Sequence, residues 1–179
     1  MMNRKNHPAF KKITRVNCPR PQVFLLDNGI QVFAFNAGTQ EVVKIDLVFN
    51  AGSYFQKQPL EAYIVNAMLS EGSTKHNSEY IASFFDYYGA FLQCEKDSDD
   101  ATVSLLTLNR HLNNTLPLLE ELVKDSIFPH EELDVLLQKR KQNLLVRLER
   151  TETLARNRFD EALFGTSHPY GMPPKPEHF

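Results

Sequence analysis

The sequence has little cysteine, no long apolar run and almost no net charge. Two cysteines, Cys18 and Cys94, cannot build a disulfide framework, and neither has a Cys or His partner at zinc-site spacing. No stretch approaches the roughly 18–20 apolar residues that a membrane-spanning helix needs. A net charge of −2 gives no general attraction to nucleic acid or to an anionic membrane. We therefore expect a soluble globular protein with no nucleic-acid partner and no membrane span.

The two ends differ in composition from the middle of the chain. Residues 1–21 are basic but lack the apolar stretch of a secretory signal, so we expect a flexible lead-in and a cytoplasmic protein. Residues 172–179 continue a proline-rich segment and are interpreted as a domain edge or a truncated linker. The domain between them, residues 22–171, is expected to be incomplete and part of a longer protein.

Hydrophobic periodicity predicts strands in groups, followed by helices, which is typical of an α+β fold. The first two strands form a hairpin around Asp27-Asn28-Gly29. Further strands are expected at 42–49, 90–95 and 101–108. Predicted helices cover 59–70, 79–88 (capped by Ser78), a segment starting at Asn109 or Asn113, 131–150 and 152–164, with a break at Phe128-Pro129.

Several strings together resemble the M16 family, the pitrilysin-like and mitochondrial-processing-peptidase-like zinc peptidases. In chain order the strings that carry the resemblance are DNGIQVF, VFNAGSYFQ, LEAYIVNAMLSEGS, DYYGAFLQCEKDSDDATVSL, FPHEELDVLLQKRKQNLLVRL and ALFGTSHPYG. The resemblance spans about residues 23–171. It implies an M16/LuxS-like metallohydrolase domain, in which a mixed, mostly antiparallel sheet packs against helices.

Active members of that family carry a His-x-x-Glu-His motif, which is absent here. The two His bind Zn²⁺ and the Glu deprotonates the metal-bound water. In the same frame this chain has Tyr63, Asn66 and Ala67. A phenol is a poor zinc ligand, an amide is no base at pH 7, and a methyl group offers no donor. The frame is fixed by its matching neighbours, Met68, Gly72 and Ser73.

The resemblance places a third ligand, a Glu, near the middle of the helix at 131–150. Arg147 aligns best with this position, and Leu144 is the nearest alternative. Neither side chain can bind zinc, and a guanidinium would repel it. We therefore expect no catalytic residue and no metal at these degenerate positions, and no cofactor.

The resemblance also implies partners. Family domains enclose peptides in pairs, so the first hypothesis is a non-catalytic subunit or domain. It would pair with an active M16 peptidase chain, or with a second M16-like domain of the same protein, around an unfolded peptide. In active members the peptide adds as a strand at an edge that matches Leu92, Gln93, Cys94 and Glu95 here, and strand addition uses only backbone groups.

Two alternatives remain open. The first is a zinc-dependent metalloendopeptidase whose ligands have moved to His76, His111 or His130, although their scattered spacing argues against it. The second is a structural core or assembly subunit that binds no peptide. His168 is interpreted as part of a structural turn, and the cluster Lys139-Arg140-Lys141 as a solvated helix face.

Overall fold

The computed structural model describes Lys12, Thr14 and residues 16–179 of the chain. The predicted lead-in, 1–21, falls largely outside these residues. The chain divides into two compact units, Met1–Gln40 and Glu41–Phe179. Within the described residues no helix is both long enough and apolar enough to cross a membrane.

The first unit contains the predicted hairpin. Strand β1 (Gln22–Leu25) pairs antiparallel with β2 (Gln31–Ala34). Gly29, at φ 82°, takes the left-handed conformation that a side chain would disfavour. The turn is closed by the backbone N–H of Gly29, which donates to the carbonyl of Leu26, and by Asn28 Oδ1, which accepts from the N–H of Ile30. The Asp-Asn-Gly prediction is confirmed.

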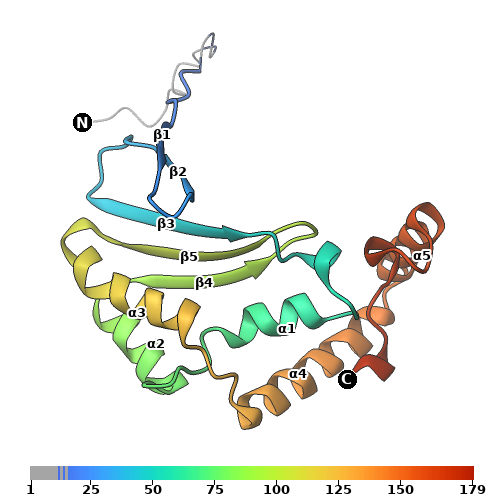
Figure 1. Cartoon of the computed structure of the whole chain (residues 1–179). Helices are drawn as coiled ribbons and strands as arrows, with labels where there is room; N and C mark the ends of the chain where they lie inside the picture. The colour runs from blue at the N-terminus through green and yellow to red at the C-terminus, as the bar shows by residue number, and fades with distance from the viewer. Residues whose placement is uncertain (1–11, 13, 15) are drawn as a thin grey trace, which may run out of the picture. The chain divides into compact units, whose positions relative to one another are not determined.

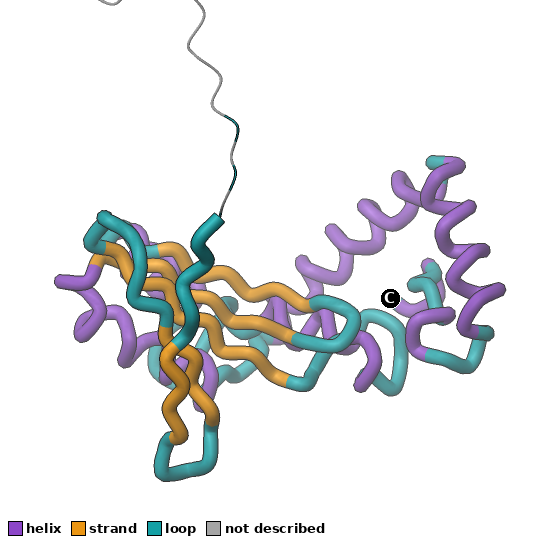
Figure 2. The backbone as a smooth tube through the Cα atoms, turned by 90° about the horizontal axis from the view of Figure 1, so that it is seen from above, coloured by secondary structure: helices purple, strands orange, loops and turns teal. Residues whose placement is uncertain are grey.

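The second unit is built on a three-stranded antiparallel sheet in the order β3-β5-β4, with strands side by side (Figures 1 and 2). Its strands are β3 (Val42–Phe49), β4 (Phe91–Lys96) and β5 (Ala101–Leu108). The central strand β5 buries alternate residues, Ala101, Val103, Leu105 and Thr107, as expected when one face of a sheet is covered.

Helices α2 (Ser78–Tyr87) and α3 (Leu112–Lys124) supply the rest of the core. Ile81 and Phe85 of α2 pack with Leu118, Leu119 and Leu122 of α3 against the buried face of β5. Strands come in groups along the chain, β1–β3 and β4–β5, each followed by helices, and the helices pack on one face of the antiparallel sheet, which confirms the predicted α+β fold.

The remaining helices follow the prediction closely, with local differences. These helices are α1 (Glu61–Met68), α4 (His130–Leu148) and α5 (Thr151–Phe164). The predicted Ser78 cap is wrong, because Asn77 precedes α2 and its side chain accepts from the N–H of Tyr80. Helix α3 begins at Leu112, after a 3-10 turn over Asn109–His111, so neither predicted Asn starts it. The break before α4 is confirmed.

Candidate functional site

The segment that leads into α1 is fastened to the turn between β4 and β5. The N–H groups of Gly52, Ser53 and Tyr54 donate to the carbonyls of Asp99, Asp97 and Ser98, at 3.1, 3.1 and 2.8 Å. The Nζ of Lys96 donates to the Oγ of Ser53 at 2.6 Å. Helix α1 therefore lies against β4, and it also contacts α4.

Helix α1 begins at a strained residue. Leu60, at φ 79°, adopts the left-handed conformation, which costs about 1–2 kcal/mol for a residue with a side chain. The side chain of Leu60 is only 6% exposed, so its burial offsets that cost. This combination fixes the direction in which α1 leaves the loop. Asn66 and Met68 consequently face the interior, at 5% and 0% exposure.

The structure brings together two of the four degenerate positions. Tyr63 of α1 and Arg147 of α4 line the same open cavity of about 500 Å³. Asn66 instead lines a separate, largely apolar cavity of about 360 Å³ beside the end of β3. Ala67 is half-buried. Tyr63 and Arg147 therefore share a cavity, whereas Asn66 lines a different one.

Arg140, which sequence reasoning assigned to a solvated helix face, is a member of this site. Its guanidinium lies 4.1 Å from the centroid of the Tyr63 ring, a cation–π arrangement. It is half-buried and lines the same cavity. The spacing of Arg140, Leu144 and Arg147 on one face of α4 (i, i+4, i+7) was the available sequence signal.

Both residues considered for the third ligand face this region. Leu144 is 7% exposed and lines a small recess with Leu60, Arg140 and Arg147. Leu144 and Arg147 both lie on the face of α4 toward α1. Whichever of them occupies the position of the third ligand, that position provides no group that binds zinc. The site offers a phenol, two guanidiniums and an aliphatic side chain in place of imidazoles and carboxylates. These residues do not fit Zn²⁺, because guanidiniums are permanently cationic and have no lone pair to donate.

The histidines considered as relocated ligands are not brought together. His76 bonds to Glu121, His111 lies beside Tyr88, and His130 is the first residue of α4. Among the described residues, no group of three or more His, Cys, Asp or Glu side chains is arranged to hold a metal ion. His168 accepts from the N–H of Tyr170 at the start of a 3-10 turn, as the structural interpretation predicted.

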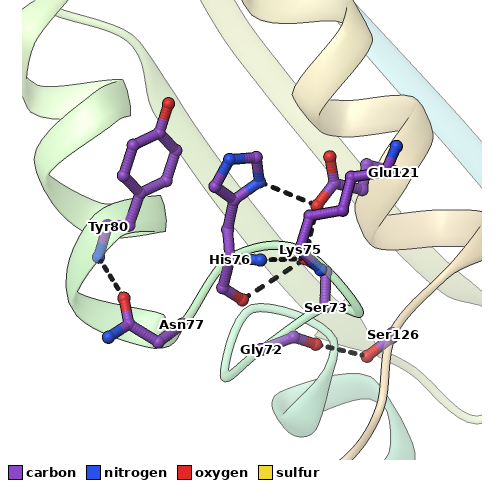
Figure 3. A network of polar contacts seen from close by, with 8 residues as sticks. All are labelled: Gly72, Ser73, Lys75, His76, Asn77, Tyr80, Glu121 and Ser126. Carbon is purple, nitrogen blue, oxygen red and sulfur yellow. Dashed lines mark hydrogen bonds and ion pairs between the residues drawn. The ribbon is translucent and has the colours of Figure 1, made fainter.

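A polar network joins the loop after α1 to helix α3 (Figure 3). Ser73 Oγ donates to Oε1 of Glu121, and this carboxylate oxygen also accepts from His76 Nδ1–H at 2.9 Å. The backbone N–H of His76 donates to Ser73 Oγ at 2.9 Å, and its ring stacks on Tyr80. Ser73 does not contact the imidazole through its hydroxyl, so this is no nucleophile–base pair. Its role is structural, and we call these three residues, Ser73, His76 and Glu121, the clasp, because they join the loop after α1 to α3.

The clasp should make stability depend on pH. The hydrogen bond from Ser73 lowers the pKa of Glu121, with a smaller lowering from His76, against the opposing effect of burial. A carboxyl with a lowered folded-state pKa stabilises the fold above its unfolded pKa, and the stabilisation is lost as pH falls through the folded value. We expect Glu121→Gln to reduce the free energy of unfolding by about 1.5 kcal/mol at pH 7. The loss should vanish in acid. Urea denaturation between pH 7 and pH 3 measures it.

Glu120→Gln is the matched control for this experiment. Glu120 forms only an exposed pair with Lys124 on the same helix, with side chains 60% and 65% exposed. Exposed pairs of this kind contribute little, so the control should unfold like the wild type at each pH. Equal effects of the two substitutions would show that the clasp does not stabilise the fold.

Strand β4 lies at an edge of the three-stranded sheet, paired only with β5 in the described residues. Its register places Leu92 and Cys94 opposite Leu105 and Val103, on the face that packs against the helices. Gln93 and Glu95 alternate to the opposite face and are exposed. The four residues predicted to bind peptide thus sit on an edge strand beside α1, and peptide binding itself stays a prediction.

Cys94 should react slowly with thiol reagents. Burial, and secondarily the charge of Glu71, raise the pKa of Cys94 to about 11. At pH 8 roughly one thiol in a thousand is then the reactive thiolate, against about a quarter for an ordinary thiol. We expect iodoacetamide to alkylate the exposed Cys18 on the order of a hundredfold faster. Mass spectrometry of the time course, repeated on Cys18→Ser, measures both rates. Similar rates would contradict the burial of Cys94.

The family model described as Insulinase (Peptidase family M16) matches residues 31–167. The chain therefore belongs to peptidase family M16. Two curated relatives are named as uncharacterized zinc proteases. The Rickettsia felis protein is 24% identical over 110 residues, covering 60% of this chain and 27% of that protein. The Rickettsia bellii protein is 23% identical over 150 residues, covering 83% and 36%. The chain thus spans about a third of these relatives.

Solved structures give the same fold. A peptidase M16 inactive domain from Pseudomonas fluorescens superimposes with a TM-score of 0.78 and 27% identity, covering 86% of this chain and 38% of that one. A protease from Helicobacter pylori has a TM-score of 0.72, 18% identity and the same coverages. The α+β domain is therefore of the M16 type, as the sequence predicted.

Proposed function

We propose that this chain is a non-catalytic member of family M16, which pairs with an active M16 zinc peptidase and helps to enclose its peptide substrate. The observation that carries the proposal is the substitution of every metal-binding and base position within an intact family frame. Tyr63, Asn66, Ala67 and the arginine-rich face of α4 provide neither a Lewis acid site nor a general base. The similar Pseudomonas fluorescens domain, described as inactive, supports the same role.

Peptide contact is proposed at the edge of β4. A strand edge offers unpaired backbone N–H and C=O groups, and an extended peptide can pair with them irrespective of its side chains. Loss of the metal site leaves these groups unchanged. The active partner would be a separate chain or a second M16-like domain of the same protein, and it would supply the zinc chemistry.

The test combines this chain with an M16 chain or domain from the same source that carries an intact His-x-x-Glu-His motif. We expect the two to co-purify and to cleave an unfolded peptide. Substituting the motif Glu of the partner by Gln should abolish cleavage, whereas Tyr63→Phe in this chain should leave it unchanged. Cleavage that survives the partner substitution would contradict the proposal. Stable association without any peptide binding would favour the structural-subunit alternative.

Peptide binding at the edge strand β4 can be measured separately by hydrogen exchange. With the partner's motif Glu replaced by Gln to prevent turnover, added peptide should slow hydrogen exchange at the amides of β4, residues 91–96. The amides of β3 serve as the internal control, because β3 forms the opposite edge of the same sheet. Protection at neither strand, or at β3 alone, would show that the peptide does not add to β4.

A further inference from the structure

The cavity beside the degenerate metal positions collects positive charge from three separate elements. Arg140 and Arg147 come from α4, Arg156 comes from α5, and Lys96 is the last residue of β4. Arg140 and Lys96 are half-buried in its wall, while Arg147 and Arg156 are exposed. Among the described residues, Asp160 is the one carboxylate in the cavity lining.

This charge is only partly compensated by nearby carboxylates. In the described part of the chain, no carboxylate forms a salt bridge with any of the four cations. Burial, and then the charge of Arg140, lower the pKa of Lys96, against a smaller raising effect of the charge of Asp97. The fold therefore holds two like charges near each other in a partly desolvated wall, at an electrostatic cost. A bound anion would remove that cost.

We propose that this cavity binds a phosphate group, as the free ion or as part of a small phosphate ester, through Arg140, Arg147 and Arg156. The guanidinium fork matches phosphate oxygens in bidentate geometry, and Lys96 adds a point charge. The four cations outnumber the carboxylates of Asp160, Asp97 and Asp99 at this cavity, and the remaining positive charge favours an anion. This inference does not rest on the proposed pairing with a peptidase.

The remaining residues that line the cavity suit the organic part of a small phosphate ester. The cavity of about 500 Å³ lies within the size range of small-molecule sites, and Phe164, Tyr170 and Met172 supply apolar surface. Tyr170 Oη donates to Asp99, and this bond raises the pKa of Tyr170 to about 12. Its phenol therefore stays protonated, and the carboxylate that lies beside this wall is that of Asp99.

Isothermal titration calorimetry at constant ionic strength tests the proposal with inorganic phosphate and with phenyl phosphate. We expect saturable binding with one site per chain. Arg147→Gln should weaken it about tenfold or more, since charge-assisted hydrogen bonds are lost. Arg147 is exposed and makes no packing contact that Gln would disrupt in the core, and Arg156→Gln provides a second variant on another helix.

Lys141→Gln is the matched control, because it removes one positive charge from α4 outside the cavity. It should change affinity by less than about twofold. Tighter binding of phenyl phosphate would support a phosphate ester, and equal binding would support the free ion. No saturable binding of either probe, or equal weakening by Lys141→Gln and Arg147→Gln, would overturn the proposal.

Discussion

Leu119→Ala is expected to lower the free energy of unfolding by about 3 kcal/mol, within the usual range for truncating a fully buried leucine. Leu119 is 1% exposed and packs in the core between α2, α3 and β5. Its neighbours Leu105 and Leu122 are equally buried, so the space left by the missing atoms cannot be filled by small movements. Urea denaturation followed by circular dichroism gives the change in stability.

Leu116→Ala is the control on the same helix. Leu116 is 41% exposed, so its substitution by Ala removes the same atoms without opening a cavity. Its effect should be less than about 1 kcal/mol. If the two substitutions destabilise the chain equally, the packing of α3 on the sheet is not as described.

Gly52→Ala should cost about 3 kcal/mol, at the upper end of the range for overpacked positions. A Cβ at residue 52 would lie 2.4 Å from the carbonyl carbon of Asp99, 2.5 Å from the N of Asp100 and 2.6 Å from the carbonyl oxygen of Ser98. All three are backbone atoms, which cannot rotate away as the end of a side chain could. The β4–β5 turn must therefore shift, and the hydrogen bonds that fasten the segment before α1 weaken with it.

The position of α1 is the second readout for this substitution. The backbone hydrogen bonds between residues 52–54 and the β4–β5 turn form a tether that sets α1 against β4. Gly52→Ala should therefore increase hydrogen exchange at the amides of α1, residues 61–68, as well as reduce stability. Ala51→Ser, an exposed neighbour, should change stability by no more than about 0.5 kcal/mol. Unchanged exchange in α1 would show that this tether does not position the helix.

Most of the fold was predictable because its signals are local. The Asp-Asn-Gly turn, the alternation along β5 and the Phe128-Pro129 break each act within a few residues, and each appears where it was expected. The errors were also local. Asn77 and Ser78 are both good capping residues, and only the backbone conformation at Asn77 decides which one caps α2.

The site was predictable only in part, because it depends on distances between helices. The register identified Tyr63 and Arg147, which do line one cavity. The sequence could not show that Asn66 faces a different cavity, since the rotation of α1 follows from the left-handed Leu60 and the backbone tether at Gly52. Nor could it place Arg140 over Tyr63, or bring Lys96 and Arg156 to the same cavity.

The molecule shows one chemical contrast. The chain has the sheet, the edge strand and the helix α1 of an M16 domain. The positions that align with the zinc ligands of active relatives carry a phenol, a methyl group and arginine, and the position that aligns with the general base carries an amide. The arginines that line the cavity with Tyr63 oppose a divalent cation at the same place. Family membership is therefore compatible with the proposed lack of peptidase activity in this chain alone.

The most direct test measures zinc and peptidase activity in the same purified chain. The chain is incubated with excess zinc, freed of loose metal by gel filtration, and analysed by mass spectrometry of the elements and by cleavage of an unfolded peptide with and without a chelator. We predict far less than one zinc per chain and no cleavage that the chelator abolishes. One tightly bound zinc per chain, together with chelator-sensitive cleavage, would contradict the account.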